Sequence, residues 1–175
     1  MTTIIFPGQG SQYVGMAKEF NDNFPITRSI FEKIEDTCSL NIREIIFTDS
    51  NNLLNQTNYT QLAIFSVSVA IFKTLESEFE NKNFNLNYML GHSLGEYSAL
   101  VSSNILSIED GANILKIRGD LMNTAIEPNQ SCMAALIGLS SNEIENIIKN
   151  ENLNIVVAND NSPIQIVISG LNNEI

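Results

Sequence analysis

The residues best suited to chemistry lie at positions 91–95, where the sequence is GHSLG. This G-x-S-x-G pattern falls between a short apolar run at 88–90 and a segment with helical spacing of apolar residues. Strand, turn and helix in that order form the setting of a nucleophile elbow, whose glycines permit a turn that a Cβ would obstruct. The turn would expose the Ser93 hydroxyl, and the helix N-terminus would direct free N–H groups at developing negative charge. We expect Ser93 to be a nucleophile with the Leu94 N–H as an oxyanion donor; the alternative is a chance match in an ordinary turn.

A second glycine-flanked segment, PGQGSQ at 7–12, follows an apolar run at 4–6 that predicts a short buried strand. Backbone exposed after such a strand lies at the carboxyl edge of the sheet, where α/β proteins place their sites. Taken alone, the segment is better explained as a plain strand-to-helix turn with Ser11 as the N-cap. It does not match G-x-G-x-x-G, so it does not indicate dinucleotide binding.

The flanking sequence predicts the elements that must position these residues. Apolar residues on one face predict a helix over 27–38, and a run that is apolar almost all round predicts a buried helix over 59–75. Ser107 followed by Asp110 resembles a capping box at the start of a helix that reaches about Ala125. The polar stretch at 78–87 predicts a surface loop. This alternation of strands and helices predicts an α/β unit with a mainly parallel sheet over residues 1–126.

The pattern changes over residues 127–175, which predict a second, smaller unit. Its expected elements are a strand at 133–139, a helix at 141–150, and strands at 155–158 and 164–168 joined by a loop at 159–163. The order β-α-β-β is the first part of a ferredoxin-like fold. Residues 172–174 are expected to begin another helix, so the small unit is predicted to be incomplete.

Composition excludes several classes of function. The formal net charge of −11 argues against binding to a nucleic-acid backbone or to an anionic membrane surface. The two cysteines, Cys38 and Cys132, are far apart, which argues against a metal site or redox dithiol and fits a reducing cytoplasm. The first residues lack a basic segment followed by a long apolar one, so no secretory signal is expected, and no apolar run reaches the roughly 18 residues needed to span a membrane.

Several motifs in one order resemble the malonyl-CoA:acyl carrier protein transacylases, whose relatives are the acyltransferase domains of fatty acid and polyketide synthases. The likeness covers nearly all of the chain. The motifs that carry it are FPGQGSQ at 6–12, GHSLGE at 91–96, RG at 118–119 followed by LM at 121–122, MAALIGL at 133–139 and ANDNSP at 158–163.

The resemblance implies a role for each matching residue. Ser93 would attack the thioester of malonyl-CoA, and the phosphopantetheine thiol of acyl carrier protein would then take the malonyl group. Backbone N–H groups of Gln9 and Leu94 would bind the oxyanion. Arg118 would pair with the free malonyl carboxylate, for which a planar guanidinium is well suited; without the resemblance, a solvated helix arginine would be the simpler explanation. No metal and no cofactor are implied.

The chain also departs from the family. Leu62 follows Gln61 where proline is usual, and Ile164 follows Pro163 where glycine is common. The family's general base is a histidine that the resemblance places beyond residue 175, so the chain is expected to be an amino-terminal portion. Its one histidine, His92, is expected to be a structural, hydrogen-bonded residue whose side chain projects away from the Ser93 hydroxyl.

Two other functions share parts of this pattern. A serine esterase or thioesterase of the α/β-hydrolase type also carries G-x-S-x-G. An inactive acyl-binding fragment would explain the missing histidine. The esterase hypothesis is tested by whether Arg118 faces the Ser93 hydroxyl.

Overall fold

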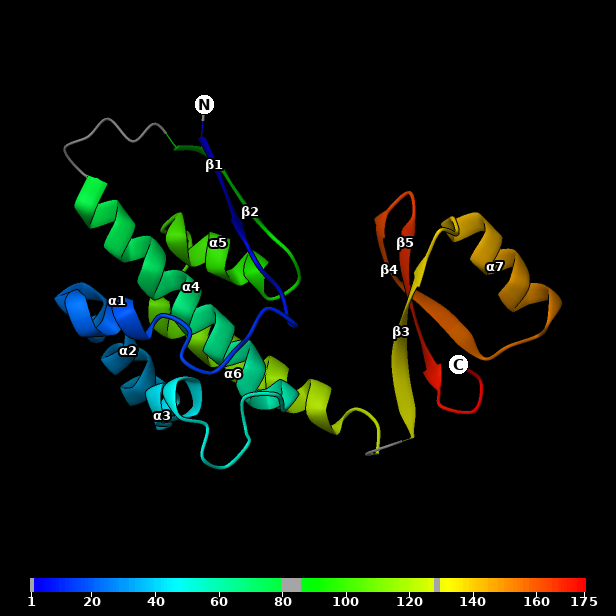
Figure 1. Ribbon diagram of the computed structural model, residues 1–175, viewed down its shortest axis with the longest axis horizontal. Coiled ribbons are helices and arrows are strands. Elements are labelled where there is room, and N and C mark those ends of the chain that lie inside the picture. Colours follow the sequence, from blue (N-terminus) through cyan, green and yellow to red (C-terminus); the bar gives the residue numbers. More distant parts are fainter. Residues whose placement is uncertain (1, 80–85, 128–129) are drawn as a thin grey trace. The chain divides into compact units, whose positions relative to one another are not determined.

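The computed structural model describes residues 2–79, 86–127 and 130–175, and the chain forms two compact units, Met1–Asn123 and Thr124–Ile175 (Figure 1). The elements of the first unit are β1 Thr2–Phe6, α1 Lys18–Asn23, α2 Pro25–Cys38, α3 Ile42–Phe47, α4 Thr57–Phe79, β2 Leu86–Gly91, α5 Gly95–Ser102 and α6 Ile108–Thr124. Those of the second unit are β3 Ser131–Ile137, α7 Ser141–Asn150, β4 Ile155–Ser162 and β5 Gln165–Leu171.

Helix α4 forms the centre of the first unit's core. Its residues are buried on most sides, as its nearly continuous apolar sequence predicts. Helix α2 packs against it through the predicted face of Ile30, Phe31, Ile34 and Cys38. Leu94 of the elbow and Leu115 of α6 belong to the same cluster, so the two segments that carry the candidate site share one core.

Strands β1 and β2 pair in parallel, with Phe6 opposite Gly91 at their carboxyl ends. The prediction of a buried strand at 4–6 is only partly correct. Phe6 is buried and its ring meets Phe72 edge to face at 6.0 Å, but the Ile5 side chain is 71% exposed. Only one face of this two-stranded sheet is covered by helices in the described residues.

The second unit is an antiparallel sheet in the order β3-β5-β4. Helix α7 packs on one face, where Ile144 meets Ile155, Ile166 and Ile168. The chain order β-α-β-β is the predicted start of a ferredoxin-like fold. Ser140 caps α7: its hydroxyl accepts from the Glu143 N–H, and the Glu143 carboxylate accepts from the Ser140 N–H.

Three local predictions need correction. The loop expected at 159–163 is mostly strand, since β4 continues to Ser162 and pairs with β5 through two irregularities. Residues 172–174 form a turn rather than the start of a helix. The two ends of the loop predicted at 78–87 are instead helix and strand, since α4 runs to Phe79 and β2 begins at Leu86; residues 80–85 lie outside the described part. Across the described residues, no helix is both long and apolar enough to cross a membrane.

Candidate active site

The strand-to-helix turn at 91–95 has the geometry of a nucleophile elbow. Strand β2 ends at Gly91, α5 begins at Gly95, and Ser93 between them has a φ of 56°. A non-glycine residue in this left-handed region costs about 1–3 kcal/mol and persists only where its surroundings impose it. The glycines explain how the turn closes: a Cβ at Gly91 would lie 2.1 Å from the Gly95 carbonyl carbon, and one at Gly95 would lie 2.3 Å from the Phe6 oxygen.

The 7–12 segment packs beside this elbow. The His92 N–H donates to the Phe6 carbonyl at 3.2 Å, and a Cβ at Gly8 would lie 2.9 Å from the His92 oxygen. Two glutamine side chains of this loop form hydrogen bonds with residues near the start of α4. Gln9 Nε2 donates to Thr57 Oγ1 at 3.2 Å, and Gln12 Nε2 donates to Asn55 Oδ1 at 2.9 Å.

The two predicted oxyanion donors are available for a ligand. Leu94 is fully buried and precedes α5, whereas Gln9 is exposed in the neighbouring loop. Within the described residues, neither backbone N–H donates a hydrogen bond. Each amide is therefore free to donate to an added oxygen atom, and because Gly8 packs on His92 the two segments that carry them are in contact.

Arg118 lies at the elbow and faces the Ser93 hydroxyl, which is the arrangement that speaks against the esterase hypothesis. Its Nη2 donates to Ser93 Oγ at 3.1 Å, and its Nη1 donates to Gln61 Oε1. The guanidinium is half-buried in a hollow between α5 and α6 whose other walls are largely apolar. The other lining residues are Tyr97, Ile114, Ile117, Leu121 and Met122.

Gln61 is a site residue that the sequence reasoning did not identify. It is 1% exposed on α4, and its two amide ends contact Arg118 and Met122. The signal available in the sequence was a glutamine at the start of the longest apolar stretch of a helix predicted to be buried. Buried polar side chains of this kind nearly always have a hydrogen-bonding partner.

His92 was expected to be a structural residue with a side-chain hydrogen bond, and the structure does not show that hydrogen bond among the described residues. The residue is exposed, and its Nδ1 lies 2.7 Å from the position a Cβ would take on Gly8. The described residues contain no group of histidine, cysteine and acidic side chains able to hold a metal ion.

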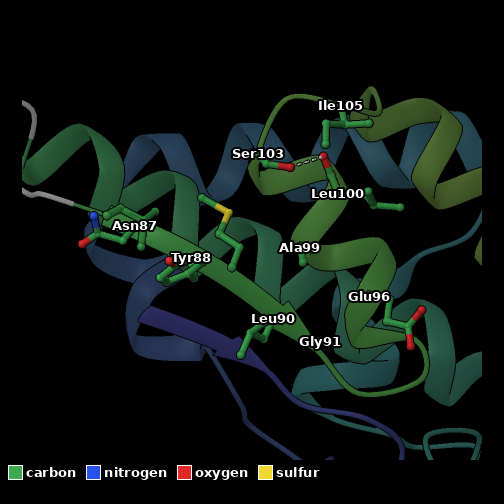
Figure 2. Close-up of a pocket in the computed structure, with 11 residues that line it drawn as sticks. Asn87, Tyr88, Leu90, Gly91, Glu96, Ala99, Leu100, Ser103 and Ile105 are labelled. Carbon is green, nitrogen blue, oxygen red and sulfur yellow. Dashed lines mark hydrogen bonds between the residues drawn. The ribbon is translucent and has the colours of Figure 1, made fainter. Parts of the chain in front are cut away.

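A separate groove runs between β2 and α5 (Figure 2). Leu90, Leu100 and Ile105 give it an apolar lining, and Glu96 lies at the end near Gly91. Neither Ser93 nor Arg118 contributes to its walls. The groove is therefore distinct from the hollow that contains Arg118.

The elbow, its neighbouring loop and Arg118 bring the predicted site residues together on one α/β scaffold. The family model for the acyl transferase domain matches residues 3–175. The chain belongs to this family, which confirms the resemblance seen in its motifs.

Individual relatives carry more specific names. The chain is 40% identical over 172 residues to a malonyl CoA-acyl carrier protein transacylase of Staphylococcus aureus, an alignment that covers 97% of this chain and 54% of that protein. The crystal structure of an acyl-carrier-protein-S-malonyltransferase from Bartonella henselae matches with a TM-score of 0.90 at 38% identity, covering 99% of this chain and 56% of that one. A malonyl-transacylase in complex with a type II polyketide synthase acyl-carrier protein matches with a TM-score of 0.89 at 31% identity, covering 98% and 55%. The chain thus spans about half the length of the curated relatives it matches.

Proposed function

We propose that this chain carries the acyl-accepting serine of a malonyl-CoA:acyl carrier protein transacylase. In the first half-reaction, Ser93 Oγ bonds to the malonyl carbonyl carbon, the carbon–sulfur bond breaks, and coenzyme A leaves as the thiol with the serine proton. In the second, the phosphopantetheine thiol of acyl carrier protein attacks the ester, and the proton returns to Ser93 as the Oγ–carbon bond breaks. This is covalent catalysis in two steps, and it needs no cofactor.

The observation that best supports malonyl as the acyl group is the contact between Arg118 and the nucleophile. A guanidinium 3.1 Å from Ser93 Oγ places a permanent positive charge where the acyl chain of a malonyl ester would begin. The free carboxylate of that group would accept a pair of parallel hydrogen bonds. A simple esterase has no use for a cation at this position, so the arginine favours transfer of a carboxylated acyl group.

Charge stabilisation at the carbonyl is assigned to the backbone. The Leu94 and Gln9 N–H groups would donate to the oxyanion of the tetrahedral intermediate. Helix α5 begins immediately after Leu94, so the partial positive charge of its N-terminus adds to the same field.

The base that accepts the Ser93 proton is not His92 in this proposal. That side chain is exposed and lies against Gly8, and the family resemblance assigns the role to a histidine outside these residues. Serine is a weak nucleophile without a base, so acylation of this chain alone should be slow and should accelerate with added imidazole.

The proposal is tested by incubating the chain with malonyl-CoA, with and without imidazole, and weighing the intact protein. We expect the mass of one malonyl group on Ser93, and its loss when phosphopantetheinylated acyl carrier protein is added. Ser93→Ala should remain unlabelled under both conditions. Equal labelling of Ser93→Ala would exclude Ser93 as the nucleophile.

A further inference from the structure

We propose that Gln61 is a positioning residue, which fixes the Arg118 guanidinium while leaving its full positive charge for the carboxylate of the acyl group. The inference rests on the proposed function and extends it to a residue on a different helix. It is carried by three features: the contacts of a buried carboxamide, the close approach of α4 to α6, and the absence of a counter-charge.

The carboxamide of Gln61 is held at both ends by α6. Its Oε1 accepts from Arg118 Nη1, and its Nε2 donates to Met122 Sδ at 3.1 Å. Arg118 and Met122 are four residues apart, and therefore lie on one face of the helix. The orientation of the amide follows from its chemistry, because a guanidinium has only donors and must meet the oxygen. At 1% exposure, Gln61 has no water with which to exchange this partner.

The backbone of α6 is shaped to allow this contact. Gly119, next to Arg118, is buried against the first turn of α4, where a Cβ on it would lie 2.9 Å from the Asn58 Cα. A side chain at 119 would push α6 away from Asn58, one turn before Gln61. The two helices thus approach closely at this one point, a turn before the short amide that reaches the arginine.

Two of the guanidinium N–H groups are engaged, one by Gln61 and one by Ser93 Oγ. Among the residues that the structure describes, no hydrogen bond engages the other N–H groups of the fork. Gln61 holds Nη1, so rotation of the guanidinium about its own bonds is restrained. A carboxylate entering beside Ser93 would therefore meet an arginine already in place rather than one that must be ordered on binding.

The Gln61 side chain that holds Arg118 carries no charge, and this feature suggests a role in recognising the carboxylate of the acyl group. Among the residues that the structure describes, no salt bridge involves Arg118. A glutamate in the place of Gln61 would accept the same hydrogen bond but would neutralise the cation. A purely structural contact would tolerate that exchange, whereas recognition of a substrate carboxylate would not.

The test compares Gln61→Glu, which keeps the acceptor and adds a charge, with Gln61→Met, which keeps the length and removes the acceptor. Gln56→Glu is the matched control, since it adds the same charge at an exposed position five residues earlier. Each variant is incubated separately with malonyl-CoA and acetyl-CoA plus imidazole, and initial labelling of Ser93 is measured by intact mass. Thermal midpoints are recorded in parallel.

For Gln61→Glu we expect the ratio of malonyl to acetyl labelling to fall about 10- to 100-fold, the size expected from losing a charged hydrogen bond, with a thermal midpoint near that of the wild type. Gln61→Met should lower malonyl labelling through a freely moving arginine, and Gln56→Glu should change neither ratio nor midpoint. A wild-type ratio in Gln61→Glu would overturn the proposal.

A second measurement separates this inference from the proposed function. If the wild-type chain takes up no malonyl group, the proposed function fails for this chain, and the Arg118 side chain is then followed by ¹⁵N NMR with added malonate. Separate Nη signals in the wild type that merge in Gln61→Met, together with malonate shifts lost in Gln61→Glu, would support the positioning role. Merged signals in the wild type, or unchanged malonate shifts in Gln61→Glu, would refute it.

Discussion

Ser93 holds a backbone conformation that its own side chain disfavours, so neighbouring residues must impose it. The φ of 56° is compensated by contacts that only glycine permits on either side. Leu94, fully buried, anchors the turn in the same core as α4. The elbow is therefore a product of packing around Ser93 rather than of the serine itself.

Gly95→Ala tests that dependence. The added Cβ would lie 2.3 Å from the Phe6 oxygen and 2.8 Å from the Pro7 oxygen, both of them backbone atoms that cannot swing aside. We expect the free energy of unfolding of the first unit, measured by urea denaturation, to fall by about 1–3 kcal/mol or more. Ser103→Ala, at the exposed end of the same helix, is the control and should change it little; an unchanged Gly95→Ala would contradict the docking of the elbow on β1.

Arg118→Ala tests the acyl preference. Because the substitution removes a charge-assisted contact to the acyl carboxylate, transfer of malonyl should lose on the order of 2–4 kcal/mol of transition-state binding. Acetyl transfer, which lacks that carboxylate, should fall little or rise. Rates of Ser93 labelling from the two CoA thioesters decide the matter, and equal losses for both would remove the role assigned to Arg118.

Individual residues of the site were predictable to different degrees. Ser93 comes from a motif with a local chemical meaning, whereas Arg118 was identified through the resemblance to the family. The structure places Arg118 Nη2 3.1 Å from Ser93 Oγ. Gln61 has no such motif, because its importance depends on the packing of α4 against α6 at Gly119. His92 was expected to form a hydrogen bond because it lies within the elbow, yet its place against Gly8 leaves it exposed.

At the scale of elements, helix α7 shows how a short polar sequence specifies its own boundary. The Ser140 and Glu143 side chains each accept from the other's backbone N–H. Ser140→Ala removes the N-cap acceptor, and N-cap losses typically cost about 0.5–2 kcal/mol. We expect faster hydrogen exchange in α7 of the whole chain, while α4 exchanges at its original rate. Unchanged exchange in α7 would show that packing against the sheet alone sets this helix.

The same capping box predicts a pH dependence. Hydrogen bonds from the Ser140 backbone N–H and hydroxyl lower the pKa of Glu143 below its usual 4.5. A carboxyl group whose pKa is lowered by folding stabilises the fold fully above its unfolded-state pKa, and that contribution is lost as the pH falls through the lower folded value. The difference in α7 protection between wild type and Glu143→Gln should therefore shrink below pH 4.5. A difference that stays constant down to acid pH would contradict the assignment.

Element prediction succeeded where periodicity was strong and failed at sheet edges. The helices at α2 and α4 follow from apolar faces that the core then uses. The Asn-Asp-Asn-Ser run after Ala158 has the composition of a loop but lies in β4, an edge strand. An edge strand accommodates polar residues because one side faces solvent and irregular pairing is tolerated there, and composition alone does not reveal that position.

At the scale of the whole molecule, the first unit exposes more apolar sheet surface than a parallel sheet normally does. Parallel sheets are usually covered on both faces, yet Ile5, Tyr88 and Leu90 are 71%, 55% and 53% exposed. The groove between β2 and α5 continues this surface through Leu100 to Ile105, itself 69% exposed (Figure 2). Contiguous apolar patches of this kind mark surfaces that bind other apolar groups.

An apolar dye should therefore report on this groove. We expect 8-anilinonaphthalene-1-sulfonate to bind the folded chain with enhanced fluorescence, and the double variant Leu90→Gln, Ile105→Gln to lose much of that signal, because both side chains line the groove and are exposed. Glu96→Gln, which alters a polar lining residue without adding apolar surface, is the control. Circular dichroism establishes that each variant is folded. Full dye binding by the folded double variant would show that the dye binds elsewhere on the chain. Loss of dye binding would identify the groove along β2 as the principal apolar surface of the first unit.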